Sequence, residues 1–100
     1  MILIKISEVP NTKKELKERT RRAWRINSSR LYNQDKVMVA YKGEILEVYK
    51  LLGYTQDAIR KDRVAFELEE IESNLRGRVI ETRTSNPCTI INEDELVFKN

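Results

Sequence analysis

The stretch KVMVAYKGEILEVYKLL, residues 36–52, decides the fold of this 100-residue chain. Residues 36–41 hold an apolar run that is too short for a buried helix and contains two valines, which predicts a central strand buried on both faces. The Lys42-Gly43 pair predicts a tight turn, because glycine reaches positive φ without strain. Residues 44–52 then alternate, with one side carrying Ile45, Tyr49 and Leu51 and the other Leu46, Val48 and Leu52. The stretch predicts a β-hairpin.

Upstream of the hairpin, the sequence predicts a strand and then a helix. Residues 2–6 alternate apolar side chains, and Pro10 ends that pattern. Thr12 and Glu15 have the spacing of a capping box, which marks a helix start. We expect this helix to stop near Trp24, at the end of its narrow apolar stripe. The stripe consists of Leu16, Thr20, Ala23 and Trp24.

The remaining segments predict short elements joined by turns. We expect an irregular connection or one short helical turn at 26–35, a loop at 55–62, a strand at 63–68, a short helix at 69–76, and short strands at 78–82, 88–91 and 96–98. Strands separated mostly by turns argue against a doubly wound parallel sheet. We predict one α+β domain over residues 1–100: a small, mostly antiparallel β-barrel with a basic N-terminal helix and a short second helix.

Composition excludes several classes of protein. The chain is 40% hydrophobic and 35% charged, which suits a globular domain, and its longest apolar run has five residues, far below a membrane span. A single cysteine excludes an internal disulfide and favours a reducing compartment. The chain has no histidine, so the usual zinc sites and the commonest general base are absent. We expect a cytoplasmic protein without a membrane partner.

Basic residues are concentrated in one segment. Residues 13–30 contain eight Lys or Arg and two Glu, a net charge of +6 in a chain whose total is +3. Clustered cations displace condensed counterions and bind phosphates with an affinity that falls with salt. The alternative interpretation is a solvated helix face whose charges pair with carboxylates elsewhere in the domain.

The aromatic residues leave two interpretations open. Trp24 lies inside the basic segment and could stack on a nucleobase, but it also ends an apolar stripe. We favour a Trp24 that packs in the core or forms a pocket wall. Tyr49 alternates with core residues, whereas Tyr32 and Tyr54 lie in expected loops and are better contact candidates.

Catalytic signals are weak. Ser28-Ser29 lacks a histidine partner, and the three glycines form no phosphate-binding loop. The glutamates of residues 67–72 are typical of a solvated helix rather than a metal site. Cys88 precedes a β-branched run and is expected to be buried and inert. We therefore expect no enzyme, no metal and no cofactor.

Five strings together resemble a known superfamily. They are ERTRRAWRI at 18–26, KVMVAYKGEI at 36–45, EVYKL at 47–51, RVAF at 63–66 and NPCTI at 86–90. Residues 18–92 resemble PUA-like domains of the kind grouped with EVE, ASCH and restriction-associated modules. The resemblance implies a pseudobarrel whose cleft accepts RNA or a modified base in DNA. On the same resemblance, the residues that would line this cleft are Trp24, Arg25, Asn27, Ser28, Arg63 and Asn86.

The sequence thus predicts a non-enzymatic module that binds nucleic acid, either RNA or modified DNA, with a basic helix and a cleft beside Trp24. The expected contact residues are Lys14, Lys17, Arg21, Arg22, Trp24, Arg25, Asn27, Ser28, Arg30, Arg63 and Asn86. Two alternatives stay open. One is a small protein-interaction or inhibitor module, and the other is a histidine-free ribonuclease that uses Lys, Arg, Tyr and Glu.

Overall fold

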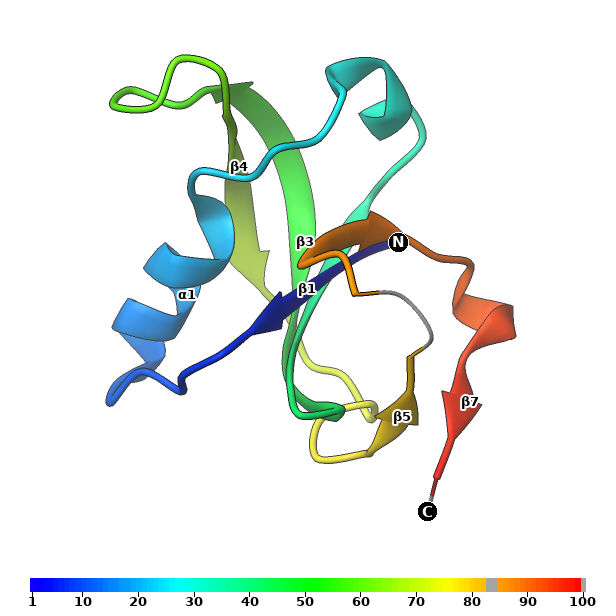
Figure 1. The fold of residues 1–100 in the computed structure, drawn as a ribbon. Coiled ribbons are helices and arrows are strands. Elements are labelled where there is room, and N and C mark those ends of the chain that lie inside the picture. The colour runs from blue at the N-terminus through cyan, green and yellow to red at the C-terminus, as the bar shows by residue number, and fades with distance from the viewer. Residues whose placement is uncertain (83–84, 100) are drawn as a thin grey trace.

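Seven strands and one α-helix make up the fold, which a computed structural model describes for residues 1–82 and 85–99. The strands are β1 (Ile2–Ile6), β2 (Lys36–Tyr41), β3 (Glu44–Gln56), β4 (Val64–Glu70), β5 (Ile80–Glu81), β6 (Cys88–Ile90) and β7 (Val97–Phe98). The helices are α1 (Lys13–Arg21) and two 3₁₀ turns, η1 (Ser28–Leu31) and η2 (Glu93–Glu95). Five strands form a sheet in the order β4-β3-β2-β1-β6, and β5 pairs with β7 (Figure 1).

The sheet is mixed but mostly antiparallel. Only β1 and β2 are parallel among the pairs in the described residues, and the segment between them, which includes α1, makes the crossover that a parallel pair requires. In Figure 1, α1 lies at the left beside β4, while β5 and β7 lie at the lower right. The α+β class and the antiparallel character predicted from sequence are confirmed.

Two hydrophobic clusters cover the two faces of the sheet. The helix-side core contains Leu16 of α1 and Trp24, and the far-side core contains Ile80 of β5. Strand β2 contributes Val37 and Val39 to the first cluster, and Met38 and Ala40 to the second. All four are at most 1% exposed, which confirms a central strand that is buried on both faces.

A β-bulge changes the expected faces of the hairpin. Val39 pairs with Glu47 while Ala40 pairs with Ile45, so Leu46 is an extra residue on β3. Because a slip of one residue moves side chains to the opposite face, Ile45 joins the far-side core and Leu46 packs against the helix-side core. The alternation predicted for residues 44–52 is therefore wrong at these two positions.

Helix α1 begins as predicted and ends three residues before Trp24. The Thr12 hydroxyl accepts a hydrogen bond from the amide of Glu15 at 3.1 Å. At the other end, the Thr20 carbonyl accepts the Trp24 indole N–H at 2.6 Å, while the Trp24 backbone N–H bonds to Val64 instead. The left-handed Ala23, with φ 64°, makes this turn. No helix in the described part of the chain is long and apolar enough to cross a membrane.

The predicted barrel is not found among the described residues, because the ladder of hydrogen bonds stays open between its outer strands β4 and β6. Part of the exposed edge of β4 is occupied by the chain that follows α1. Trp24 and Val64 exchange two backbone hydrogen bonds there, at 3.0 and 2.9 Å. Strand β6 could pair with β4 at Val64 only if Trp24 left this edge.

The predicted short helix at 69–76 is wrong. β4 runs through Glu70, so three of the glutamates at 67–72 lie on a strand, and residues 74–77 form a turn. The amide of Gly77 donates to the Ile45 carbonyl at 2.8 Å, and the amide of Ile45 donates to the Arg78 carbonyl at 2.9 Å. These hydrogen bonds tie the segment to β3. The spacing of Ile71 and Leu75 reflects packing on the far-side core instead of a helix face.

Strand β3 is longer than predicted and continues through Gln56. Leu51 pairs with Leu68 and Gly53 with Glu67, so Leu52 forms a second bulge. The strand therefore continues past Gly53, where the sequence predicted its end. Tyr54 therefore lies on a strand and not in a loop.

Replacing Gly43 by alanine tests the contact between the hairpin turn and β5. Gly43 has φ 86°, and an added Cβ would lie 2.8 Å from the Ile80 carbonyl oxygen. We expect Gly43→Ala to lower the free energy of unfolding by about 2 kcal/mol or more, measured by urea denaturation.

Two other glycines separate the causes. Gly77 has a similar positive φ, and no described residue lies within 4 Å of the added Cβ, so Gly77→Ala should cost about 1–2 kcal/mol. Gly53→Ala meets only ordinary contacts and should change stability by less than about 1 kcal/mol. Equal losses for Gly43→Ala and Gly77→Ala would show that the Ile80 contact is unimportant.

Candidate functional site

A cleft with a volume of about 800 Å³ opens beside the chain that follows α1. Its walls come from residues 22–27, from Arg63 at the end of the β3–β4 loop, and from residues 86–88. No aspartate or glutamate is among the described residues that line it. We call it the arginine cleft, after its five basic residues Arg19, Arg22, Arg25, Arg30 and Arg63.

Trp24 forms a wall of the arginine cleft and is almost fully buried. It is 5% exposed, held by its backbone pairing with Val64 and by the bond from its indole to Thr20. The Arg19 guanidinium lies 4.9 Å from the centroid of the ring, a cation–π contact. The expectation that Trp24 packs as core or pocket wall is confirmed, and a base cannot stack on its face in this arrangement.

Arg22 forms an ion pair with a buried carboxylate. Its Nε and Nη2 donate to the two oxygens of Asp57 at 3.1 and 2.9 Å. The same carboxylate accepts hydrogen bonds from the amides of Ile59 and Arg60. The Arg22 side chain, followed by the backbone amides, lowers the pKa of Asp57 well below its usual range. This ion pair fastens the β3–β4 loop to the end of α1.

Arg63 has a structural role as well as a place in the cleft. Its Nη1 donates to the Ala23 carbonyl at 3.1 Å, so it supports the left-handed turn after α1. Its Nε is buried and has no hydrogen-bond acceptor among the described residues, although it forms a 3.7 Å ion pair with a carboxylate oxygen of Asp62. Arg63 is therefore bonded to the turn after α1 and lies near the carboxylate of Asp62.

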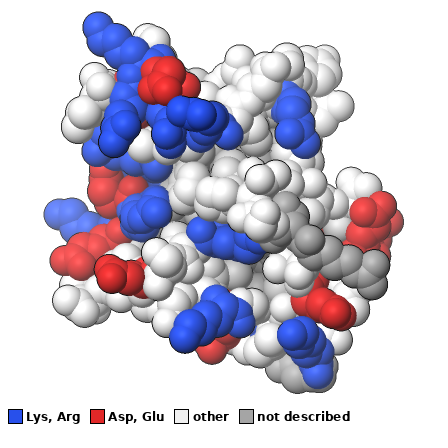
Figure 2. All heavy atoms as spheres, viewed as in Figure 1, with Lys and Arg blue, Asp and Glu red and all other residues white. Residues whose placement is uncertain are grey.

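Two arginines of the cleft remain available to a ligand. The Arg25 side chain is 75% exposed, and its only ion pair within the described residues is a 3.6 Å contact with exposed Asp62. Exposed pairs of this kind contribute about 0–1 kcal/mol, so a ligand can displace the carboxylate. Arg30 is exposed and forms no ion pair with any described residue. In Figure 2, basic side chains gather at the upper left, over α1 and the β3–β4 loop, with acidic ones among them.

Seven of the eleven predicted contact residues line the arginine cleft: Arg22, Trp24, Arg25, Asn27, Arg30, Arg63 and Asn86. Asn27 also caps η1, because its side-chain oxygen accepts from the Ser29 amide at 3.0 Å. The other four lie elsewhere. Lys14, Lys17 and Arg21 lie on α1 outside the cleft, Arg21 paired with Glu18 at 2.9 Å, and Ser28 lines a neighbouring hollow.

The sequence prediction missed five lining residues: Arg19, Ala23, Ile26, Pro87 and Cys88. Arg19 lies in the basic segment, but its contact with Trp24 depends on α1 ending at Arg21, before Trp24. Pro87 and Cys88 reach the cleft because Cys88 pairs with Ile4 of β1, a contact that leaves no local signal.

Cys88 is poorly suited to nucleophilic chemistry. Burial raises the pKa of its thiol to about 12, although the positive charge of Arg30 acts in the opposite direction. The thiol is therefore protonated at neutral pH, and the thiolate is the reactive form.

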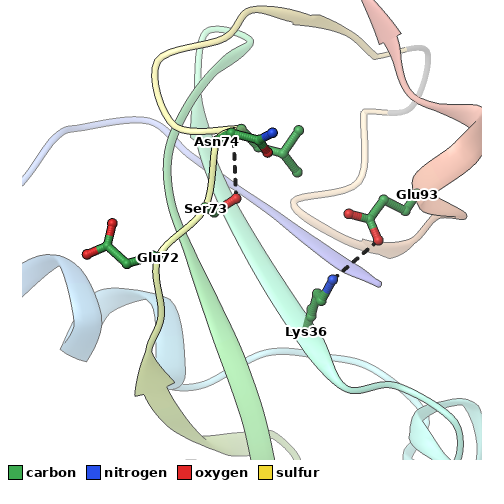
Figure 3. Close-up of a pocket in the computed structure, with 6 residues that line it drawn as sticks. Lys36, Glu72, Ser73, Asn74 and Glu93 are labelled. Carbon is green, nitrogen blue, oxygen red and sulfur yellow. Dashed lines mark hydrogen bonds and ion pairs between the residues drawn. The ribbon is translucent and has the colours of Figure 1, made fainter.

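A second hollow, of about 590 Å³, has a different character. Figure 3 shows Lys36 and Glu93 pointing toward each other across it, joined by a 3.4 Å ion pair, with Glu72 on the far side. Its two carboxylates do not suit an anionic ligand. No group of three or more Cys, Asp or Glu in residues 1–82 and 85–99 could hold a metal ion. The arginine cleft is the better candidate site.

Comparison with models of protein families, with curated protein sequences and with solved structures finds no match to this chain. The resemblance to PUA-like domains therefore stays a prediction, and the candidate function rests on the geometry and charge of the cleft.

The Asp57 carboxylate predicts a pH dependence of stability. Its pKa is lower in the folded chain than in the unfolded one, so its contribution is present above the unfolded value and is lost as pH falls below about 4. We expect Asp57→Asn to be less stable than the wild type at neutral pH and to lose less stability on acidification. Urea denaturation across a pH series measures both.

Asp62→Asn is the matched control. It removes the same charge from the same loop at a side chain that is 66% exposed. We expect its stability and its acid dependence to follow the wild type. An Asp57→Asn variant with the acid dependence of the wild type would contradict this role of the ion pair.

Proposed function

We propose that this protein is a non-enzymatic nucleic-acid-binding module whose arginine cleft holds backbone phosphates. One observation carries the proposal: among the described residues, five arginines and no carboxylate line a single open cleft. A planar guanidinium donates two parallel hydrogen bonds to a phosphate, which makes arginine the usual residue for such sites. The ligand class is RNA or DNA.

Four of the five arginines divide into two kinds, and the fifth, Arg19, lies over the Trp24 ring. Arg22 and Arg63 hold the walls, through Asp57 and the Ala23 carbonyl. Arg25 and Arg30 have exposed side chains that can reach a phosphate. Only the second kind can be changed without disturbing the fold. A charge reversal at Arg22 would leave Asp57 buried without its partner, so it would test stability before binding.

The resemblance to PUA-like domains supports the proposal at the level of the fold. The chain after α1 pairs with the edge of β4 and lines the cleft together with residues 86–88, so it lies in the gap between the outer strands β4 and β6. We infer a pseudobarrel that is completed by this segment and not by strand pairing. The arginine cleft is then the mouth of the pseudobarrel.

The test is a binding measurement with short labelled RNA and DNA strands across a salt series. Each phosphate contact contributes about 0.7–0.9 to the slope of log K against log salt. We expect the double variant Arg25→Glu/Arg30→Glu to bind at least about tenfold more weakly at low salt and to reduce that slope by about 1–2.

A matched control reverses two charges outside the cleft. Lys13→Glu/Lys14→Glu changes the net charge equally in the exposed first turn of α1, where acidic residues favour the helix dipole. We expect a smaller loss of affinity from it. Equal losses would place the contact on α1 and contradict the proposed cleft. No binding of any strand at low salt would contradict the function and favour the alternative, a small protein-interaction module.

A further inference from the structure

A hollow of about 450 Å³ shares lining residues with the arginine cleft. We call it the tyrosine hollow, and its lining residues are Ile26, Ser28, Tyr54, Thr55, Gln56, Lys61, Asp62, Arg63 and Val64. Ile26 and Arg63 line both hollows. The two hollows are therefore neighbours, close enough for adjoining parts of one ligand.

Tyr54 is the aromatic side chain of the tyrosine hollow, and its position is fixed. It is 42% exposed, although large aromatic side chains are usually buried. Its hydroxyl donates to the Ser28 carbonyl at 3.4 Å, and its backbone lies in β3, paired with Phe66. The ring is thus bonded through its hydroxyl and supported by the sheet, while part of it faces solvent.

Arg63 marks the boundary between the two hollows. Its side chain is 27% exposed, and it lines both hollows. The exposed part of the Arg63 side chain can meet a phosphate at this boundary. The neighbouring carboxylate of Asp62 lines the tyrosine hollow and not the arginine cleft.

The charges of the two hollows differ accordingly. In the part of the chain that the structure describes, all charged residues that line the arginine cleft are cations, whereas the tyrosine hollow combines Lys61 and Arg63 with Asp62. The tyrosine hollow also contains the polar side chains of Ser28, Thr55 and Gln56. A phosphate suits the first composition. An uncharged nucleobase, with donors and acceptors along its edge, suits the second.

We propose that the ligand is single-stranded nucleic acid, with one base on Tyr54 and the adjoining phosphate at Arg63 and Arg25. This inference rests on the proposed function and adds the strandedness of the ligand to it. A base within a duplex is stacked on both faces and cannot reach an aromatic side chain, whereas a single strand exposes its bases. Stacking also tolerates any base, so little sequence preference is expected.

The experiment compares wild type, Tyr54→Ala and Tyr54→Phe with labelled single strands and the matching duplexes across a salt series. We expect the single strand to bind more tightly than the duplex. Tyr54→Ala should weaken single-strand binding about tenfold without changing the salt slope, because stacking releases no counterions. Tyr54→Phe keeps the ring and should stay within about twofold of the wild type.

Tyr32→Ala is the matched control. Tyr32 is 86% exposed at the end of η1 and lines neither hollow, so its loss should leave affinity unchanged. Thermal unfolding of each variant establishes that it is folded at the assay temperature. If Tyr54→Ala does not fold, a base analogue whose fluorescence is quenched by stacking reports the contact in the wild type and in Tyr54→Phe.

The outcomes separate the two proposals. Equal affinity for single strand and duplex, an unchanged Tyr54→Ala, or a fluorescent base that is not quenched overturns the single-strand inference. The arginine cleft still stands in that case if Arg25→Glu/Arg30→Glu lowers affinity and salt slope. Absence of all binding at low salt overturns the proposed function and this inference with it.

Discussion

The hydrogen bond from the Trp24 indole to the Thr20 carbonyl is the interaction on which this architecture depends. In a continuing helix, that carbonyl would accept the backbone N–H of Trp24. Here the indole satisfies it, so α1 can end while the backbone of Trp24 turns to pair with Val64. Thr20 is fully buried, and its hydroxyl bonds to the Leu16 carbonyl. One side chain thus ends the helix, fills the core and covers part of the edge of β4.

The arginine cleft follows from that anchor, because the chain leaving Trp24 carries Arg25 and Arg30 away from the core. The two carboxylates of the β3–β4 loop have different roles. Asp57 is buried and neutralises Arg22, which stabilises the wall, whereas Asp62 is exposed and only approaches Arg25. The domain therefore holds its cleft together with one charge pair while leaving other cations accessible. An arginine that is fully paired with a buried carboxylate helps to shape the cleft but contributes little to the binding of a ligand.

Features that depend on neighbouring residues could be predicted from the sequence, whereas features that depend on contacts between distant segments could not. The cap at Thr12 and the doubly buried strand at residues 36–41 were predictable, since both arise from neighbouring residues. The bulge at Leu46 and the failed helix at 69–76 were not, because register and hydrogen bonds to β3 decide them. For the candidate site, the basic segment was visible, but the separation of Arg21 and Lys17 from the cleft depends on where α1 ends.

The amino-acid sequence by itself determined the strands near residues 2–6 and 36–41, the start of α1 after Thr12, and the concentration of positive charge in residues 13–30. Periodicity, capping and charge are local properties, so they can be predicted from neighbouring residues. Only the tertiary structure decided that Asp57 belongs to Arg22 and that Arg63 and Pro87 meet across one cleft. These contacts join residues far apart in the chain, and packing of the sheet against α1 brings them together.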